Sequence, residues 1–340
     1  MLSNRFKPAI LAAFLSVGVV QWAEAQPPVG SRASGMAGAF VGVSDDASAV
    51  YWNPAGLATG AFASFVVGFG EEERIPPAAG VRDGAWRGTG RIVALSLPPV
   101  GFAYYRQGVY ASGRAEPAVL GVPGREEVRS SVHALTTSTV GVALLHSLNE
   151  YVVVSTTLKL VRGRAAAGFA NTANAGDALD AAVDLDGDSE TRGDFDTGVM
   201  VALNQFRMGL VVRNVTTPSF TLEAAVSEPV ELKREARIGA GWGSGWPGMS
   251  RVVVDVDADL MSRATPSGDR RDLAGGVETW WKTRRVGVRA GARRSMIGAS
   301  RSVVAAGVSA GVTASIFLEG HVARGQRDER AWSIGARFGF

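Results

Sequence analysis

The last eleven residues of the chain alternate between two kinds of side chain. Trp332, Ile334, Ala336, Phe338 and Phe340 fall on one side, and the residues between them are small or polar. A period of two is the period of a β-strand, in which successive side chains point to opposite faces. The chain therefore ends on a strand with one apolar face, and this constrains the interpretation of every upstream segment.

The first 25 residues form a different pattern. Arg5 and Lys7 precede an apolar run over residues 9–20, and Ala-Glu-Ala follows at residues 23–25. A basic start, a short apolar run and an A-x-A site are typical of a secretory signal peptide, so we interpret residues 1–25 as one. The alternative is a membrane anchor. The apolar run is too short for that role, because a helix needs about 20 residues to cross a bilayer.

The terminal aromatic strand resembles the strand by which bacterial outer-membrane barrels engage their insertion machinery. This resemblance implies a partner, the barrel-assembly machinery, which would recognise the strand that ends at Phe340. It also implies that the protein lies in the bacterial outer membrane, in contact with the lipids there. The predicted signal peptide agrees with export from the cytoplasm.

Composition excludes several classes of protein. Removal of 25 residues from 340 leaves about 315, enough for one large barrel or two soluble domains. No later run of about 18 apolar residues is present, which excludes helical membrane spans. The absence of cysteine excludes disulfides and thiolate metal sites. The formal charge is +3, and no block of like charges indicates nucleic-acid binding.

From about residue 60 onward the sequence consists of alternating segments of about ten residues, the length of a tilted membrane-spanning strand. About fourteen such segments can be placed, and an even number is what single-chain bacterial barrels have. We expect strands near residues 61–70, 90–98, 100–109, 130–146, 151–163, 191–203, 206–216, 229–241, 250–261, 271–281, 284–294, 301–310, 313–323 and 330–340.

The connections between these segments alternate in length. With the N-terminus on the periplasmic side, the connections after odd-numbered strands face outward, and the long ones are 71–89, 110–129, 164–190 and 217–228. The connections after even-numbered strands are mostly tight, as at Pro98-Pro99. Long outer loops and short periplasmic turns are typical of outer-membrane barrels. The sequence therefore predicts an all-β fold, an antiparallel transmembrane β-barrel.

Strands in the second half of the chain carry apolar residues on one face and charged residues on the other. A soluble protein could have the same stripes, but both chain ends favour a barrel with its charged face inward. Arg289, Arg293 and Arg237 could meet a ligand carboxylate there, or they could form ion pairs with acidic residues on neighbouring strands. The expected lattice of lumen charges comprises Asp255, Asp257, Asp259, Glu278, Arg285, Arg289, Arg293 and Arg237.

The segment before the barrel is rich in glycine and alanine and lacks the ten-residue alternation. Asn53 followed by Pro54 is an N-cap with proline at the first helical position, which predicts a short helical turn. A segment this irregular cannot face lipid, because its backbone groups would lack hydrogen-bond partners. We therefore expect an intraluminal hatch over residues 26–60, followed by the barrel over residues 61–340.

Two stretches of this segment, GSRASGMAGAF at residues 30–40 and DDASAVYWNPAGL at residues 45–57, resemble the N-terminal hatch of the FadL-like family. These proteins are outer-membrane transporters of long-chain fatty acids and other hydrophobic compounds, and their barrels also have fourteen strands. The tripeptide Asn53-Pro54-Ala55 is the family's hatch motif. Two relatives share the pattern: barrels of the type IX secretion machinery, and barrels similar to a conjugal-transfer protein.

The resemblance implies passive uptake through a plugged, monomeric barrel and no enzymatic activity. The ligand, a hydrophobic small molecule or fatty acid, would meet an apolar pocket above the hatch and leave sideways where a strand kinks. Gly101 and Gly108 on the third strand could permit such a kink, or they could only ease barrel curvature. The alternative function is a scaffold for secretion or assembly partners. Candidate ligand-facing residues of the hatch are Phe40, Val50, Tyr51, Trp52 and Leu57.

Two further patterns are weaker. Asp184, Asp186 and Asp188 have the alternate spacing of a calcium loop, but the glycine falls one position too early for an EF-hand. His321 could pair with a nearby serine such as Ser333 as in a hydrolase. No nucleophile motif accompanies His321 and Ser333, so we assign no catalytic residue. We also assign no metal site and no cofactor.

Overall fold

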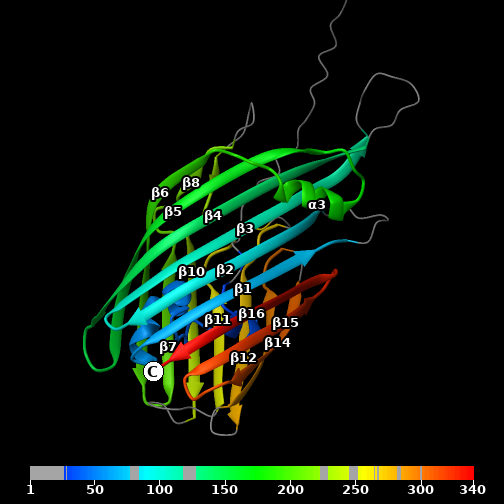
Figure 1. Cartoon of the computed structure of the whole chain (residues 1–340). Helices are drawn as coiled ribbons and strands as arrows, with labels where there is room; N and C mark the ends of the chain where they lie inside the picture. The colour runs from blue at the N-terminus through cyan, green and yellow to red at the C-terminus, as the bar shows by residue number, and fades with distance from the viewer. Residues whose placement is uncertain are drawn as a thin grey trace, which may run out of the picture.

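The computed structural model describes residues 27, 29–76, 84–117, 128–222, 229–244, 252–263, 265, 268–281, 285–298 and 301–340. The predicted signal peptide lies outside the described residues. Fourteen strands form one closed antiparallel barrel, in which the last strand pairs with the first (Figure 1). The predicted fold class and strand number are therefore confirmed.

Every expected strand has an observed counterpart. The barrel strands are β1 (Ser64–Arg74), β2 (Ala85–Leu97), β3 (Val100–Pro117), β4 (Val128–Ser147), β5 (Val152–Ala170), β6 (Ser189–Leu203), β7 (Phe206–Arg213), β10 (Glu235–Gly243), β11 (Val252–Asp259), β12 (Asp272–Trp281), β13 (Val286–Ser295), β14 (Ser302–Gly311), β15 (Ile316–Gly325) and β16 (Glu329–Gly339). The connections alternate in length as expected, with the tight turns at one end of the barrel.

The two faces of the wall differ as a membrane barrel requires. Side chains that face outward include many large apolar residues left 37–63% exposed, such as Leu160, Val308 and Val322. Inward positions on the same strands carry buried polar and charged side chains, such as Lys159 and Glu319. Alternation of apolar-out and polar-in gives each strand a lipid face and a lumen face.

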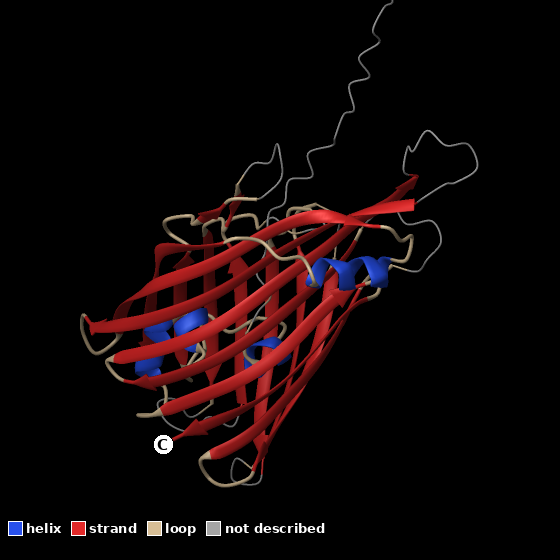
Figure 2. Ribbon diagram, turned by 45° about the horizontal axis from the view of Figure 1, so that its top comes forward, coloured by secondary structure: helices blue, strands red, loops and turns tan. Residues whose placement is uncertain are grey.

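The N-terminal segment folds inside the barrel, where Figure 2 shows its short helices enclosed by strands. It contains α1 (Ser31–Gly35), α2 (Ala49–Trp52) and a 3₁₀ helix, η1 (Pro54–Thr59). Nearly all of its residues from 31 to 57 are buried. The main apolar core of the protein lies between this hatch and the inner face of the wall.

One side of the wall is taller than the other. Strands β3, β4 and β5 have 18, 20 and 19 residues, and they extend further than the sequence pattern predicted. The helix α3 (Ala175–Val183) covers the outward face of this extension (Figures 1 and 2). A small hairpin of β8 (Ser219–Phe220) and β9 (Val230–Glu231) covers its inner face. Apolar packing on both faces stabilises the extension.

The described residues contain no helix that is both long and apolar enough to cross a membrane.

Replacement of Val308 by arginine tests the lipid face. Val308 is 58% exposed on the outward side of β14, and a charge near the bilayer midplane costs about 2–4 kcal/mol. We expect Val308→Arg to lower the free energy of unfolding in lipid vesicles by about that amount. Val183→Arg, on the exposed side of α3, is the control and should change stability by less than about 0.5 kcal/mol. An equal loss of stability in both variants would contradict the assignment of Val308 to the lipid face.

Candidate functional site

Asn53 links the hatch motif to the wall. Its side chain is fully buried and caps η1 by accepting a hydrogen bond from the backbone N–H of Ala55 at 3.3 Å. Its Nδ2 donates to the carbonyl oxygens of Val41, at 3.2 Å, and of Val199 on β6, at 3.1 Å. The predicted cap is observed, and Pro54 occupies the first position of the helix. One side chain therefore joins two parts of the hatch to the barrel.

Arg32 on α1 makes the strongest charged contact between hatch and wall. Its Nε and Nη2 donate to the two carboxylate oxygens of Glu278 on β12, at 2.9 and 2.8 Å. Its Nη1 pairs with Asp45 and, at 3.2 Å, with Asp46, both within the hatch. Burial disfavours the charge on Arg32, but Asp45, Glu278 and Asp46 outweigh it and hold its pKa well above the ordinary value.

Backbone N–H groups of the hatch are bound by carboxylates of β11. Phe40 and Val41 both donate to Asp257, at 2.9 Å each, and Gly42 donates to Asp255 at 3.2 Å. Arg237 on β10 pairs with Asp257 at 3.1 Å, and it donates to the carbonyl oxygen of Gly38 at 3.1 Å. The aspartates therefore satisfy backbone donors that have no helix or sheet partner.

The remaining lumen charges form ion pairs with one another, some between neighbouring strands and some between strands that are not adjacent. Arg289 lies 3.3 Å from Glu278, and Arg293 lies 3.2 Å from Glu329 and 3.3 Å from Glu72. The geometry thus favours the ion-pair alternative for these arginines over a free carboxylate site. Further pairs of the same kind join Arg237 to Asp259, Arg263 to Asp259 and Asp272, Arg270 to Asp272, Arg337 to Glu319, and Lys159 to Asp194 and Asp196.

Arg285 does not belong to this lattice. It precedes β13, in the turn after β12, and its side chain is exposed. The alternating pattern assigned it to the inner face with Arg289, but the strand begins only at Val286. Outside the strand, the period of two no longer determines which way a side chain points.

The five expected ligand-facing residues of the hatch do not face open space. Phe40, Val50, Tyr51, Trp52 and Leu57 are at most 5% exposed and pack in the core between hatch and wall. Edge-to-face aromatic contacts join Trp52 to Phe40 and Tyr51, and join Tyr51 to Tyr105 of β3. Their apolar surface holds the hatch in place, which corrects the expectation from the sequence.

No gap opens at the two glycines of β3. The described strand pairs in continuous register from Val100 to Ser112 with both β2 and β4. Gly101 instead allows close packing, because an added Cβ would lie 2.6 Å from Leu57 and 2.8 Å from Val50. At Gly108 a Cβ would meet Tyr110 and Thr89 of the wall. The predicted lateral opening at this strand is therefore not observed.

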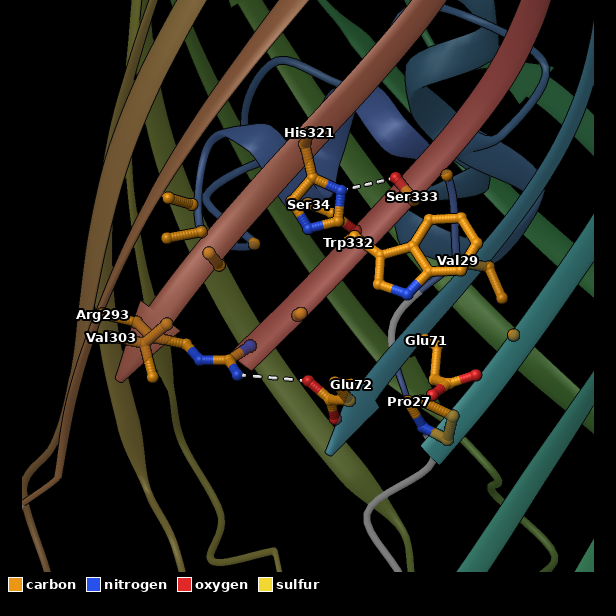
Figure 3. A pocket seen from close by; sticks show the side chains of 18 residues that line it. Pro27, Val29, Ser34, Glu71, Glu72, Arg293, Val303, His321, Trp332 and Ser333 are labelled. Carbon is orange, nitrogen blue, oxygen red and sulfur yellow. Dashed lines mark hydrogen bonds and ion pairs between the residues drawn. The ribbon is translucent and has the colours of Figure 1, made fainter. Parts of the chain in front are cut away.

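A small cavity of about 30 Å³ lies between the start of the hatch and the wall formed by β1 and β14–β16 (Figure 3). Its apolar lining includes Val29, Ala305 and Ala331, and its polar lining includes His321 and Ser333, which hydrogen-bond to each other. A void of this size holds about two water molecules. It is therefore too small to hold an organic ligand in the structure described.

A groove of about 350 Å³ lies on the outer side of the same part of the wall. Ala323, Ala331, Trp332 and Glu71 line both the groove and the inner cavity. The paired strands β15, β16 and β1 are therefore the partition between the two spaces, and the inward side chains Ala323 and Ala331 are small there.

The weaker candidates are the acidic loop at residues 184–188 and the pair of His321 with Ser333, and their contacts are structural. Asp184 ends α3, and Asp186 pairs with the exposed Arg164 at 3.2 Å. No cluster of three metal-ligating side chains occurs within the described ranges. Ser333 also donates to Ser31 of the hatch at 2.8 Å, which places the His321 pair in a structural hydrogen-bond chain.

The sequence interpretation missed the role of Arg32. It is the only basic residue between positions 29 and 60, a segment otherwise made of small and apolar residues with two aspartates. A lone arginine in such a segment requires a buried partner, and this signal indicates a charged anchor. Its partner Glu278 lies 246 positions away, however, so the pair itself is a property of the tertiary fold.

Comparisons with known proteins point to one fold. The Ralstonia pickettii toluene transporter TbuX has a TM-score of 0.60 at 11% identity, over 92% of this chain and 98% of that one. The monoaromatic hydrocarbon channel CymD has a TM-score of 0.59 at 13% identity, over 92% and 97%. A Pseudomonas aeruginosa FadL homologue has a TM-score of 0.55 at 10% identity, over 94% and 99%. This chain has a FadL-like fold.

Comparison of the sequence with protein-family models gives one match, which covers part of the chain. The family described as "F plasmid transfer operon, TraF, protein" matches residues 121–259. These residues include α3 and the barrel strands from β4 to β11. No curated protein matches the chain.

Replacement of Arg32 tests the anchor of the FadL-like hatch. We expect Arg32→Met to destabilise hatch docking by about 3–5 kcal/mol, because it leaves buried carboxylates without their partner. Hydrogen exchange over residues 31–59 should increase accordingly. Arg285→Met, which removes an exposed arginine, is the control and should leave exchange unchanged. Restored protection in the double variant Arg32→Met/Glu278→Met would support the pair, and unchanged exchange in Arg32→Met would refute it.

Proposed function

We propose that this protein mediates passive uptake of hydrophobic compounds across the bacterial outer membrane. The FadL-like fold supports this proposal, since similar structures at low identity include a toluene transporter and hydrocarbon channels. The observation that carries it is the inner cavity, which shares the lining residues Ala323, Ala331, Trp332 and Glu71 with the outer groove. To reach the lipid side of the wall, a hydrophobic molecule would have to separate paired strands at this position and move Trp332.

The route we propose runs beside the β1–β16 seam. It replaces the route through β3 because the cavity and the groove both border this seam and neither is lined by β3. The pairing of β1 with β16 is continuous, so passage requires these strands to separate. Gly70 on β1 lies opposite Ser333, and Glu72 lies opposite Ala331, so the inner surface of the seam carries few bulky side chains. Trp332 separates the cavity from the groove on the outer side.

Transport requires rearrangement of the hatch or of this wall. A cavity of about 150 Å³ is what benzene occupies in a protein core, and the cavity here has about 30 Å³. The start of the hatch, from Val29 to Gly38, lines one side of the cavity, so a shift of this segment would enlarge it. We propose that the structure is the closed state.

Neutral compounds suit the cavity better than fatty acids. Arg293, the one arginine in its lining, is within 3.3 Å of two carboxylates, Glu72 and Glu329. A ligand carboxylate would have to displace one of them. The proposed substrate class is therefore uncharged and hydrophobic, and His321 is the polar side chain of the lining that one ligand hydroxyl could contact.

Several properties accompany this proposal. Residues 1–25 act as a signal peptide, residues 26–60 form the hatch and residues 61–340 form the barrel. The barrel-assembly machinery recognises the last strand through Phe340, and the mature barrel works as a monomer in contact with outer-membrane lipid. No catalytic step is involved.

The second candidate function is a scaffold for secretion or conjugal-transfer partners. The partial match to the F plasmid TraF family favours it, as does the closed lumen. The two functions differ in whether a small molecule passes through the protein, because a scaffold needs no such path.

A test of uptake uses cells that depend on this protein for entry of a neutral aromatic hydrocarbon. Ala331→Trp should reduce the initial uptake rate to that of cells lacking the protein, because the indole fills the passage. Ala310→Trp, on the exposed lipid face of β14, is the matched control and should transport normally. Wild-type uptake equal to that of cells without the protein would instead favour the scaffold. Normal uptake by Ala331→Trp would exclude the seam route but would leave the uptake function in place.

A further inference from the structure

Three arginines form a row on the outer surface of the tall side of the wall. Arg91 on β2 lies directly opposite Arg106 on β3, and Arg106 lies opposite Ser138 on β4. Ser138 in turn lies opposite Arg162 on β5. All three arginine side chains are exposed on the outward face. Adjacent strands are about 4.8 Å apart, so the row spans roughly 15 Å across four strands.

Like charges directly opposite each other destabilise an antiparallel strand pair. The chain contains a second outward pair of this kind, Arg324 opposite Arg330, and there Glu73 of β1 pairs with Arg330 at 2.6 Å. Arg91 and Arg106 have no such compensation, since no described carboxylate forms an ion pair with either residue. Arg91 lies over the ring of Phe69, 5.3 Å from its centroid, and keeps its guanidinium donors available.

Arg162 also lacks a carboxylate partner among the described residues. Its Nη2 donates to the hydroxyl of Ser189, at 2.8 Å. Three positive charges thus share one surface whose only described hydrogen-bond partner is a neutral hydroxyl. A surface of this kind attracts an anion from outside the chain.

The surroundings of the row indicate the kind of anion. The adjacent row toward the short turns is apolar and 44–61% exposed, and it consists of Val93, Tyr104, Val140 and Leu160. The adjacent row toward the long loops is small or polar, with Thr89, Gly108, Thr136 and Arg164. Beyond it lies α3, where Asp180 pairs with Arg87 of β2 at 2.9 Å. The arginines therefore lie at the boundary between an apolar wall and a polar one.

We propose that Arg91, Arg106 and Arg162 bind the phosphate groups of a phosphorylated glycolipid in the outer leaflet, whose acyl chains lie on the apolar row. This inference depends on the outer-membrane location given under the proposed function. Guanidinium groups bind phosphate oxygens through two parallel hydrogen bonds, and a boundary position lets the headgroup stay hydrated. Arg106 and Arg162 are separated by two strand spacings, about 10 Å, which suits a headgroup with two phosphates.

The lipid would also stabilise the tall side of the barrel. A headgroup bound to the row bridges β2, β3 and β5, three of the four strands on which α3 packs. Binding and uptake are separate properties, because the row lies on the outer face of β2–β5 and the proposed passage lies at β1, β15 and β16.

The test uses the purified full-length barrel in neutral detergent and native mass spectrometry. The probes are diphosphorylated lipid A, the same lipid with its phosphates removed, and inorganic phosphate. We expect lipid A to bind the wild-type protein at least tenfold more tightly than the dephosphorylated lipid. The triple variant Arg91→Gln/Arg106→Gln/Arg162→Gln should bind lipid A at least tenfold more weakly. Arg271→Gln, which removes an exposed arginine before β12, should bind as the wild type does.

Two further measurements keep the proposal falsifiable if the triple variant folds poorly. The triple lysine variant retains the charge and should keep most of the binding. In lipid-free detergent, Arg106→Gln alone should raise the midpoint of thermal unfolding, because it removes the like-charged pair. Equal binding of dephosphorylated lipid, saturation of the row by inorganic phosphate alone, or binding by the triple glutamine variant within twofold of wild type would each overturn the proposal. None of these results depends on uptake.

Discussion

The closure of the sheet is the constraint on which the rest of the structure depends. A sheet edge cannot face hydrocarbon, because each unpaired backbone N–H or C=O group there would cost several kcal/mol. The pairing of β16 with β1 removes both edges, and it also creates an enclosed lumen. Charged side chains that face this lumen must then find partners inside it. The lattice of arginines and carboxylates follows from that requirement.

The hatch uses this lattice to stay in place. Asp255 and Asp257 bind hatch N–H groups, and Glu278 binds Arg32, so the wall supplies carboxylates where the irregular hatch backbone lacks partners. The aromatic residues of the hatch add apolar contact rather than a ligand surface. Buried pairs of this kind are weak evidence for net stability, but removal of one partner is costly. The hatch is therefore held by apolar packing together with charge pairing, and any opening must exchange the charged partners rather than simply break contacts.

Both faces of the wall contribute to the proposed function in different places. Beside the β1–β16 seam, the inner cavity and the outer groove share four lining residues, and the paired strands separate the two spaces. On the tall side, the hairpin of β8 and β9 and the helix α3 thicken the wall. The arginine row lies below α3, where a thickened wall meets the apolar band. A passage at β1, β15 and β16 and a lipid anchor on β2–β5 would let the barrel be held while the seam moves.

The sequence by itself determined the class of fold, the strand count and the hatch motif. The alternation over Arg330–Phe340 and in the thirteen upstream segments has a local cause, because successive side chains of a strand point to opposite faces. The helix cap formed by Asn53 and Pro54 also depends only on neighbouring residues. Local pattern could not place Arg285, which lies just outside its strand. It could not show that Leu57 fills the space beside Gly101, or that Arg32 pairs with Glu278. Those contacts join residues far apart in the chain, and only the register of the closed barrel decides which of them meet.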